Sequence, residues 1–173
     1  MKTIIIVDLE ATCSEKRNIE NEIIEIGAVK IQDNKVVSTF DEFVKPILNP
    51  ILTDFCKELT TISQENVDNA NKYPEVFKRF KEWIGTDDFI LMSWGFYDKK
   101  QFIHDCNLHK LPTNWIKEHN NIKLQFANAT GHKPCGMDKA LRILGIPLEG
   151  THHRGIDDAN NIAKIYLNIT KEN

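Results

Sequence analysis

The chain has 173 residues, of which 41% are hydrophobic and 27% are charged, and this predicts one folded domain over residues 1–173 rather than a disordered segment. Its 22 Lys and Arg residues against 25 Asp and Glu residues give a net charge of −3, which excludes a protein that holds long polyanions by overall charge. No apolar run approaches the roughly 20 residues of a membrane span, and the first residues do not form a secretory signal, so we expect a cytoplasmic protein without membrane association.

The first half of the chain contains three strand signals. A β-branched run at residues 4–7 is typical of a strand that is covered on both faces, and it ends at Asp8. Residues 23–31 and 36–44 are two further β-rich segments, and the turn-forming pair Asp33-Asn34 between them predicts a hairpin. The stretch that follows mixes short helical and loop signals.

Helices and strands alternate in the middle of the chain. Pro74 suits the first turn of a helix whose apolar stripe runs to residue 84, where Gly85 and the Asp87-Asp88 pair end it. Residues 89–92 are a second buried strand, and a helix is predicted from residue 98 to about residue 107.

The last third contains one weak strand signal and two helices. Residues 122, 124 and 126 are apolar and alternate as in a strand. Residues 137–144 are helical, with Gly145 and Pro147 as the stop, and a final helix is expected over residues 156–169. Strands followed by alternating helices and strands predict an α/β protein with a mixed sheet and helices on both faces.

Two carboxylates stand at the end of the first strand. Asp8 and Glu10 are two positions apart, so the period of a strand places both side chains on one face. A single acidic residue at a strand end usually marks where the chain leaves the core. Two close carboxylates repel each other unless a cation lies between them, so this pair indicates a site for a metal ion.

A third carboxylate, Asp98, opens the helix that follows the second buried strand. Asp is a preferred N-cap residue, which gives this position an ordinary structural interpretation beside the functional one.

The final helix places a fourth carboxylate inward. Asp158 shares one face with three isoleucines at positions 162, 165 and 169, whereas Asp157, Asn161, Lys164 and Asn168 form the polar face. A carboxylate on an apolar face needs a partner, which a cation, a buried Arg or an amide can supply. His153 lies on the loop before this helix, where it can exchange a proton near neutral pH, although a lone His is most often structural or solvated and His152 stands beside it.

These residues occur in an order that resembles the DEDDh superfamily of 3′-5′ exonucleases, most closely the branch of Eri-type RNA exonucleases and bacterial sporulation-inhibitor-type homologues. The resemblance extends across nearly the whole chain and rests on the segments Val7-Asp8-Leu9-Glu10-Ala11-Thr12-Cys13, Asn21-Glu22-Ile23-Ile24-Glu25-Ile26-Gly27-Ala28-Val29, Phe43-Val44-Lys45-Pro46, Leu52-Thr53-Asp54-Phe55-Cys56, Ser93-Trp94-Gly95-Phe96-Tyr97-Asp98 and Gly155-Ile156-Asp157-Asp158.

The resemblance implies an RNase H-like fold with a mixed five-stranded sheet flanked by helices. It implies that Asp8, Glu10, Asp98 and Asp158 hold two Mg²⁺ or Mn²⁺ ions, and that His153 is the general base, because His152 does not match the family spacing to Asp158. The reaction would release nucleoside 5′-monophosphates from the 3′ end of RNA or short single-stranded nucleic acid.

Substrate contacts follow from the same resemblance. Ala11 and Thr12 would lie near the terminal sugar, and Leu59 and Trp94 would pack against the last bases, although a lone Leu or Trp is more often part of the core. Two positions depart from the pattern, because Thr61 replaces a glycine that is common in relatives and Arg154 follows the histidine where other residues are frequent.

Three other functions remain open at this point. The chain can be a DNA-directed 3′-5′ exonuclease with the same chemistry, or a regulatory module that keeps the fold and binds another protein. An RNase H-type endonuclease fits less well, because the H-x-x-x-x-D arrangement favours cutting at ends. A protein partner for targeting is possible, since the core itself has no appended RNA-binding domain within these residues.

Overall fold

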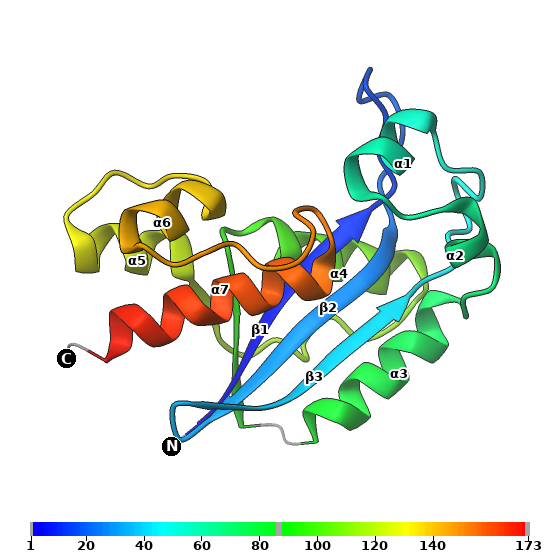
Figure 1. Ribbon diagram of the computed structural model, residues 1–173. Helices are drawn as coiled ribbons and strands as arrows, with labels where there is room; N and C mark the ends of the chain where they lie inside the picture. The colour runs from blue at the N-terminus through cyan, green and yellow to red at the C-terminus, as the bar shows by residue number, and fades with distance from the viewer. Residues whose placement is uncertain (1, 86–87, 172–173) are drawn as a thin grey trace.

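The computed structural model describes residues 2–85 and 88–171 and contains a five-stranded mixed sheet in the order β3-β2-β1-β4-β5 (Figure 1). The strands are β1 (Thr3–Ala11), β2 (Ile23–Gln32), β3 (Lys35–Phe43), β4 (Phe89–Ser93) and β5 (His119–Asn121). The helices are α1 (Asp54–Thr60), α2 (Gln64–Asp68), α3 (Tyr73–Ile84), α4 (Tyr97–Leu108), α5 (Ile122–Thr130), α6 (Met137–Leu144) and α7 (Gly155–Thr170). The α/β class and the mixed five-stranded sheet are confirmed.

Strand β1 is the centre of the sheet. It pairs antiparallel with β2 and parallel with β4, and β2 and β3 form the predicted antiparallel hairpin. Asp33 and Asn34 both have positive φ angles, of 48° and 57°, which is the geometry that a tight two-residue hairpin turn requires.

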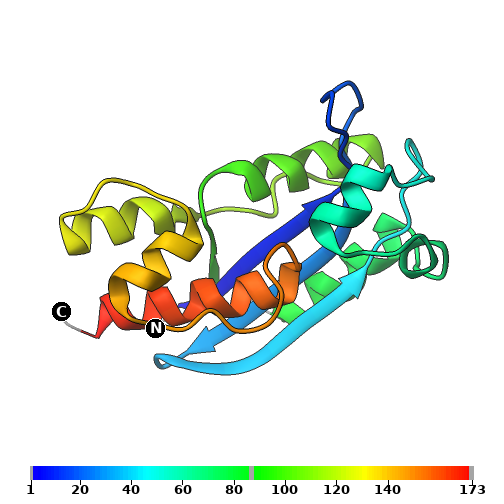
Figure 2. The same ribbon diagram turned by 45° about the horizontal axis from the view of Figure 1, so that its top comes forward.

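Helices cover both faces of the sheet, which explains why the first strand reads as a continuous apolar run. Ile5 and Val7 pack with α3 and α4 on one face, whereas Ile6 packs with α5, α6 and α7 on the other. Figures 1 and 2 show α7 lying across β1 and β2 on this second face. None of the helices in the described ranges has the length and apolar character that a bilayer-spanning segment requires.

The four helices predicted from residue 74 onward are confirmed as α3, α4, α6 and α7. Val76, Phe80 and Ile84 are buried along α3, and Gly85 ends the helix in the left-handed conformation with φ 71°. Asp87, which was also expected in this stop, lies outside the described residues. The stretch before α3 forms the short helices α1 and α2, in agreement with its mixed signals.

Two expectations were wrong. Residues 122–126 form the start of helix α5 instead of a strand, because Asn121 accepts a hydrogen bond from the Leu124 N–H as an N-cap and Ile122 and Phe126 are buried one helical turn apart. Asn161 is fully buried rather than part of a polar face, because its amide bonds the backbone N–H and C=O of Glu149.

Candidate active site

The end of β1 delivers two carboxylates to one cavity. This cavity of about 340 Å³ is lined by Asp8, Leu9, Glu10, Trp94, Tyr97, Asp98, Gly136, Met137, Asp138, His152, His153 and Asp158. The segment that carries Asp8 and Glu10 pairs with β2, whereas its pairing with β4 stops at Ile6. The carboxylates therefore emerge where β1 extends past β4 and leaves room beside it.

The N-terminus of α7 delivers the third carboxylate, and its position depends on two glycines. A Cβ atom on Gly27 of β2 would lie 2.0 Å from the backbone carbon of Gly155, and a Cβ on Gly155 would lie 2.8 Å from the Asp8 carbonyl oxygen. This close approach brings oxygen atoms of Asp8, Glu10 and Asp158 within 4.8 Å of one another. Asp158 is also buried on the inward face of α7, as its spacing to the isoleucines predicted.

Asp98 comes to the cavity from α4 and is not an N-cap. The N-cap position is Phe96, and the Asp98 carboxylate instead accepts a hydrogen bond from the backbone N–H of Leu9 at 3.0 Å. Because β4 has already ended, this side chain satisfies a backbone group of β1 that has no strand partner on that side.

An ion pair between Glu25 of β2 and Arg154 holds the start of α7 against the sheet. Glu25 lies opposite Glu10 on the neighbouring strand, is fully buried, and accepts a hydrogen bond from the Gly155 N–H at 3.0 Å. The Arg154 guanidinium lies 3.3 Å from the Glu25 carboxylate and 5.1 Å from the ring centroid of Phe43. Arg154, which departs from the family pattern, thus contacts residues of the sheet and does not line the cavity.

The electrostatics of the cavity favour protonation or a cation. Burial and the negative charges of its carboxylate neighbours raise the pKa of Asp8 well above its ordinary value, and the same causes raise the pKa of Glu10 to about 9. Burial raises the pKa of Asp98 to about 6 despite the hydrogen bond from Leu9. Among the described residues that line the cavity there is no Lys or Arg, so these charges have no side-chain counterion within it.

Both histidines lie beside Asp158. His152 Nδ1 is 2.9 Å from the Asp158 Oδ2 atom, and the backbone N–H of His153 donates to the same oxygen at 3.0 Å. The two rings stack with centroids 3.9 Å apart. Burial and the neighbouring His152 lower the pKa of His153, which favours its neutral form.

The predicted substrate contacts are distributed over two cavities. Trp94 lines the cavity of the carboxylates and donates from its indole to the Cys135 carbonyl, whereas Leu59 lines a second cavity of about 480 Å³. Thr12 is buried, with its hydroxyl accepting from the Glu22 N–H, and Ala11 is buried just before it. The Thr12 N–H also donates to the Glu22 carbonyl at 2.8 Å, and neither residue lines the cavity of the carboxylates, so their contact with a sugar stays a prediction.

Sequence reasoning missed several lining residues. Tyr97 stands directly before Asp98, which was a usable signal, whereas Asp138 at the start of α6 had none. The carboxylate of Asp138 accepts a hydrogen bond from Arg142 at 3.0 Å, so its charge is paired with a guanidinium that does not line the cavity.

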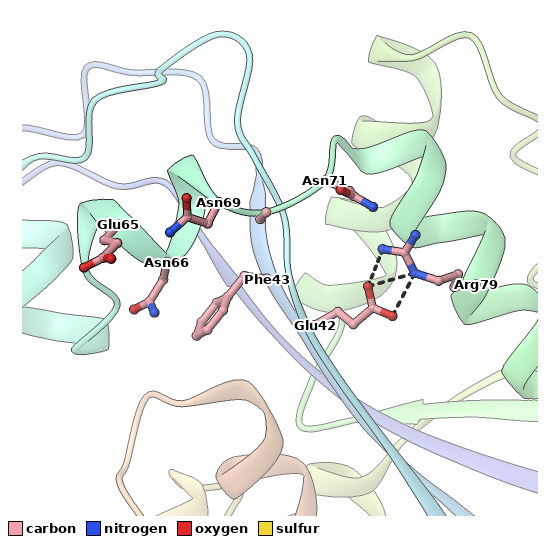
Figure 3. A pocket seen from close by; sticks show the side chains of 8 residues that line it. Glu42, Phe43, Glu65, Asn66, Asn69, Asn71 and Arg79 are labelled. Carbon is pink, nitrogen blue, oxygen red and sulfur yellow. Dashed lines mark hydrogen bonds and ion pairs between the residues drawn. The ribbon is translucent and has the colours of Figure 1, made fainter.

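A separate hollow of about 460 Å³ lies between β3, α2 and α3 (Figure 3). Glu42 and Arg79 form a bidentate ion pair at its edge, with the shortest N–O distance at 2.6 Å. None of the residues predicted to carry chemistry lines it. The cavity at the end of β1 is therefore the candidate active site.

Comparison with known proteins identifies the class. Residues 5–166 match the RNase T family model, described as exonuclease. The human 3′-5′ exoribonuclease 1 is 32% identical over 98% of the chain, which covers 52% of that protein, and the probable 3′-5′ exonuclease KapD of Bacillus subtilis is 30% identical, with 98% and 85% covered. The chain thus spans about half the length of the curated exoribonucleases it matches and most of KapD.

Solved structures agree on the fold. The nuclease domain of 3′hExo, a DEDDh family member bound to rAMP, superposes with a TM-score of 0.92 at 30% identity, with 99% of this chain and 92% of that chain covered. Escherichia coli exonuclease I, at 10% identity and a TM-score of 0.80 with 99% and 41% covered, shares the fold alone. The chain belongs to the DEDDh, RNase T-like family of 3′-5′ exonucleases, and its fold is RNase H-like.

Proposed function

We propose that this protein removes nucleoside 5′-monophosphates one at a time from the 3′ end of RNA or short single-stranded nucleic acid. In this proposal Asp8, Glu10, Asp98 and Asp158 hold two Mg²⁺ or Mn²⁺ ions and His153 is the general base. The observation that carries it is the convergence of carboxylate oxygens from β1 and α7 within 4.8 Å, in a cavity that His153 also lines.

The donor set fits hard divalent cations. Carboxylate oxygens are the ligands that Mg²⁺ and Mn²⁺ prefer, and the repulsion that raises the pKa of Asp8 and Glu10 is relieved by positive charge between them. When bound, a pair of such ions stabilises the attacking and leaving oxygens of an in-line phosphodiester displacement.

His153 accepts a proton from the attacking water. Its lowered pKa keeps the imidazole neutral near pH 7, which is the form that can act as a base. The Asp158 carboxylate accepts a hydrogen bond from the backbone N–H of His153. The proposed metal ligand therefore also positions the proposed general base. The attacking water and the scissile phosphate would lie in the cavity between His153 and the carboxylates of Asp8 and Glu10.

RNA is the favoured substrate because the relatives at about 30% identity are named exoribonucleases and the 3′hExo nuclease domain is described with rAMP bound. The half-buried ring of Trp94 and the exposed side chain of Leu59 provide apolar surface for unstacked bases, a mode of contact that tolerates different sequences.

Timed digestion of matched oligonucleotides tests the proposal. RNA and DNA strands of one sequence, labelled at the 5′ end and either free or blocked at the 3′ terminus, are incubated with Mg²⁺ or Mn²⁺. We expect a ladder that shortens by one nucleotide, release of 5′-monophosphates, faster loss of RNA, and no reaction in EDTA. His153→Asn and Asp8→Asn should lose at least about 100-fold in rate, whereas His132→Asn, which changes an exposed histidine that does not line the cavity, should not.

Three results would redirect the assignment. Faster loss of DNA than RNA selects the DNA-directed exonuclease, whereas products longer than mononucleotides select an endonuclease. If every strand survives in Mn²⁺ and the folded protein captures a defined protein partner, the regulatory module is the function.

A further inference from the structure

Asp158 belongs to a second group of ligand atoms besides the carboxylate group. One nitrogen from each of His152 and His153 and one oxygen of Asp158 lie within 4.8 Å of one another. His152 Nδ1 is 2.9 and 3.1 Å from the two Asp158 oxygens, and the stacked imidazole rings are inclined by 23°. Because an imidazole nitrogen binds an ion in the plane of its ring, a single ion can contact all three side chains once the two rings turn out of their stack.

The loop before α7 holds these groups in place. His153 has a positive φ of 65°, an unfavourable conformation for a residue with a side chain, and its backbone N–H is fixed on Asp158. The next carboxylate, Asp157, accepts from the Thr151 N–H at 2.8 Å and lies against Gly150. Two consecutive aspartates thus fold the loop around the start of the helix and hold the backbone that carries both imidazoles.

The donor atoms of this group differ in kind from those of the carboxylate group. Two imidazole nitrogens and one carboxylate oxygen suit Zn²⁺ and similar borderline transition-metal ions, with a fourth position open to water. Mg²⁺ requires near-octahedral oxygen ligands and is not bound well by such a set. The His152 side chain is 40% exposed, so an ion can reach the group from solvent.

We propose that His152, His153 and Asp158 form a binding site for a borderline transition-metal ion, with Zn²⁺ as the probe, and that an ion bound there inhibits the enzyme. Inhibition has two causes: the ion occupies the imidazole that would accept the proton, and it withdraws Asp158 from the catalytic carboxylate group. This second part rests on the proposed function, whereas binding itself does not. His152, which the family spacing leaves without a role, supplies the third ligand.

Binding is tested without any activity measurement. The full chain is titrated with Zn²⁺, and separately with Co²⁺ followed by its visible absorption, in excess Mg²⁺ so that the carboxylate group is occupied. We expect His152→Asn to weaken Zn²⁺ binding at least about tenfold and to remove the Co²⁺ bands, because the Asn amide keeps a hydrogen bond to Asp158 but is a poor ligand for Zn²⁺. His132→Asn is the matched control and should bind as the wild type does. Equal Zn²⁺ affinity of His152→Asn and wild type would overturn the proposal.

The inhibitory effect is tested on the oligonucleotide reaction in Mg²⁺. Zn²⁺ should inhibit the wild type and His132→Asn at the same concentration, and at least about tenfold more Zn²⁺ should be needed for His152→Asn, which leaves the proposed general base in place. Unchanged inhibition of His152→Asn contradicts this part of the proposal. If the wild type has no nuclease activity in Mg²⁺, the proposed function fails, and the binding titration still decides the metal site.

Discussion

The Asp98 carboxylate accepts the backbone N–H of Leu9 at 3.0 Å and so replaces the strand partner that β1 lacks beyond the end of β4. We predict that Asp98→Ala lowers the free energy of unfolding by about 1–3 kcal/mol, because it leaves a buried N–H without an acceptor. Asp98→Asn keeps an amide oxygen for that N–H and should cost less, while both variants lose the proposed metal ligand. Urea denaturation of the two variants measures the difference, and equal losses would show that the hydrogen bond does not contribute.

The contact between Glu25 and Arg154 predicts coupling between two substitutions. Arg154→Ala leaves a fully buried carboxylate without its cation, and we expect it to lower the free energy of unfolding by roughly 1–3 kcal/mol, a loss reduced from the fully buried case because Arg154 is partly exposed. Adding Glu25→Gln to Arg154→Ala should recover part of that loss, since the neutral amide needs no counterion. A double-mutant cycle by urea denaturation checks this, and simple additivity of the two losses would contradict the pairing.

Thr61 follows α1 as its C-cap with a positive φ of 60°, at the position where the family resemblance leads us to expect glycine. A β-branched residue is strained in this conformation, so Thr61→Gly should raise the free energy of unfolding by about 0.5–1 kcal/mol despite the greater entropy of glycine in the unfolded chain. Thr61→Ala, which keeps a Cβ atom, serves as the comparison and should gain less. Thermal unfolding of the three proteins decides the order, and a Thr61→Gly protein less stable than the wild type would argue against strain at this turn.

The parts of the site that the sequence revealed are those that local periodicity encodes. The two-residue period of β1 placed Asp8 and Glu10 on one face, and the helical period of α7 turned Asp158 inward. The ordered motifs added Asp98 and His153 through a family resemblance, and the structure brings all five to one cavity, which leaves their catalytic roles as the proposal above.

The parts that could not be predicted depend on contacts between distant segments. Nothing in the sequence around Glu25 indicates that it contacts Arg154, 129 positions away. Nor does the sequence indicate that Asp98 accepts a hydrogen bond from the backbone N–H of Leu9. Asn161 was assigned to a polar face because helical spacing says nothing about the loop at Glu149 that covers it. The start of α5 was misread for a related reason, since apolar residues four apart fit both a strand and a helix and only the cap at Asn121 distinguishes them.

The glycine contact between β2 and α7 predicts that Gly27→Ala is strongly destabilising. The added methyl group would lie 2.0 Å from the Gly155 backbone, which cannot move without shifting the helix that carries Asp158. We expect a loss of at least about 2 kcal/mol in the free energy of unfolding and weaker metal binding by the folded fraction. Gly136→Ala is the control, because its new Cβ atom would meet only a flexible carboxylate oxygen of Asp138 at 2.9 Å. Similar stability of Gly27→Ala and wild type would mean that α7 is free to move.

The raised pKa values predict that the metal-free protein loses stability as the pH rises. Glu10, with a pKa of about 9, and Asp98, with a pKa of about 6, bind protons more tightly in the folded than in the unfolded chain, so their stabilising contribution is complete below about pH 4 and is lost as the pH rises through these values. In EDTA, this contribution should fall by at least about 1.4 kcal/mol between pH 5 and pH 8, the equivalent of one pKa unit. Glu10→Gln removes one of the titrating groups and should show a smaller fall.

Mg²⁺ should reverse this loss, and more strongly at pH 8 than at pH 5, because only the ionised carboxylates bind the cation and binding to the folded state alone adds to its stability. Urea denaturation at both pH values, with EDTA or with Mg²⁺, measures the four stabilities for the wild type and for Glu10→Gln. Two results would contradict repulsion between the carboxylates of β1 and α7. In the first, the stability of the metal-free wild type falls no more between pH 5 and pH 8 than that of Glu10→Gln. In the second, Mg²⁺ stabilises the protein equally at the two pH values.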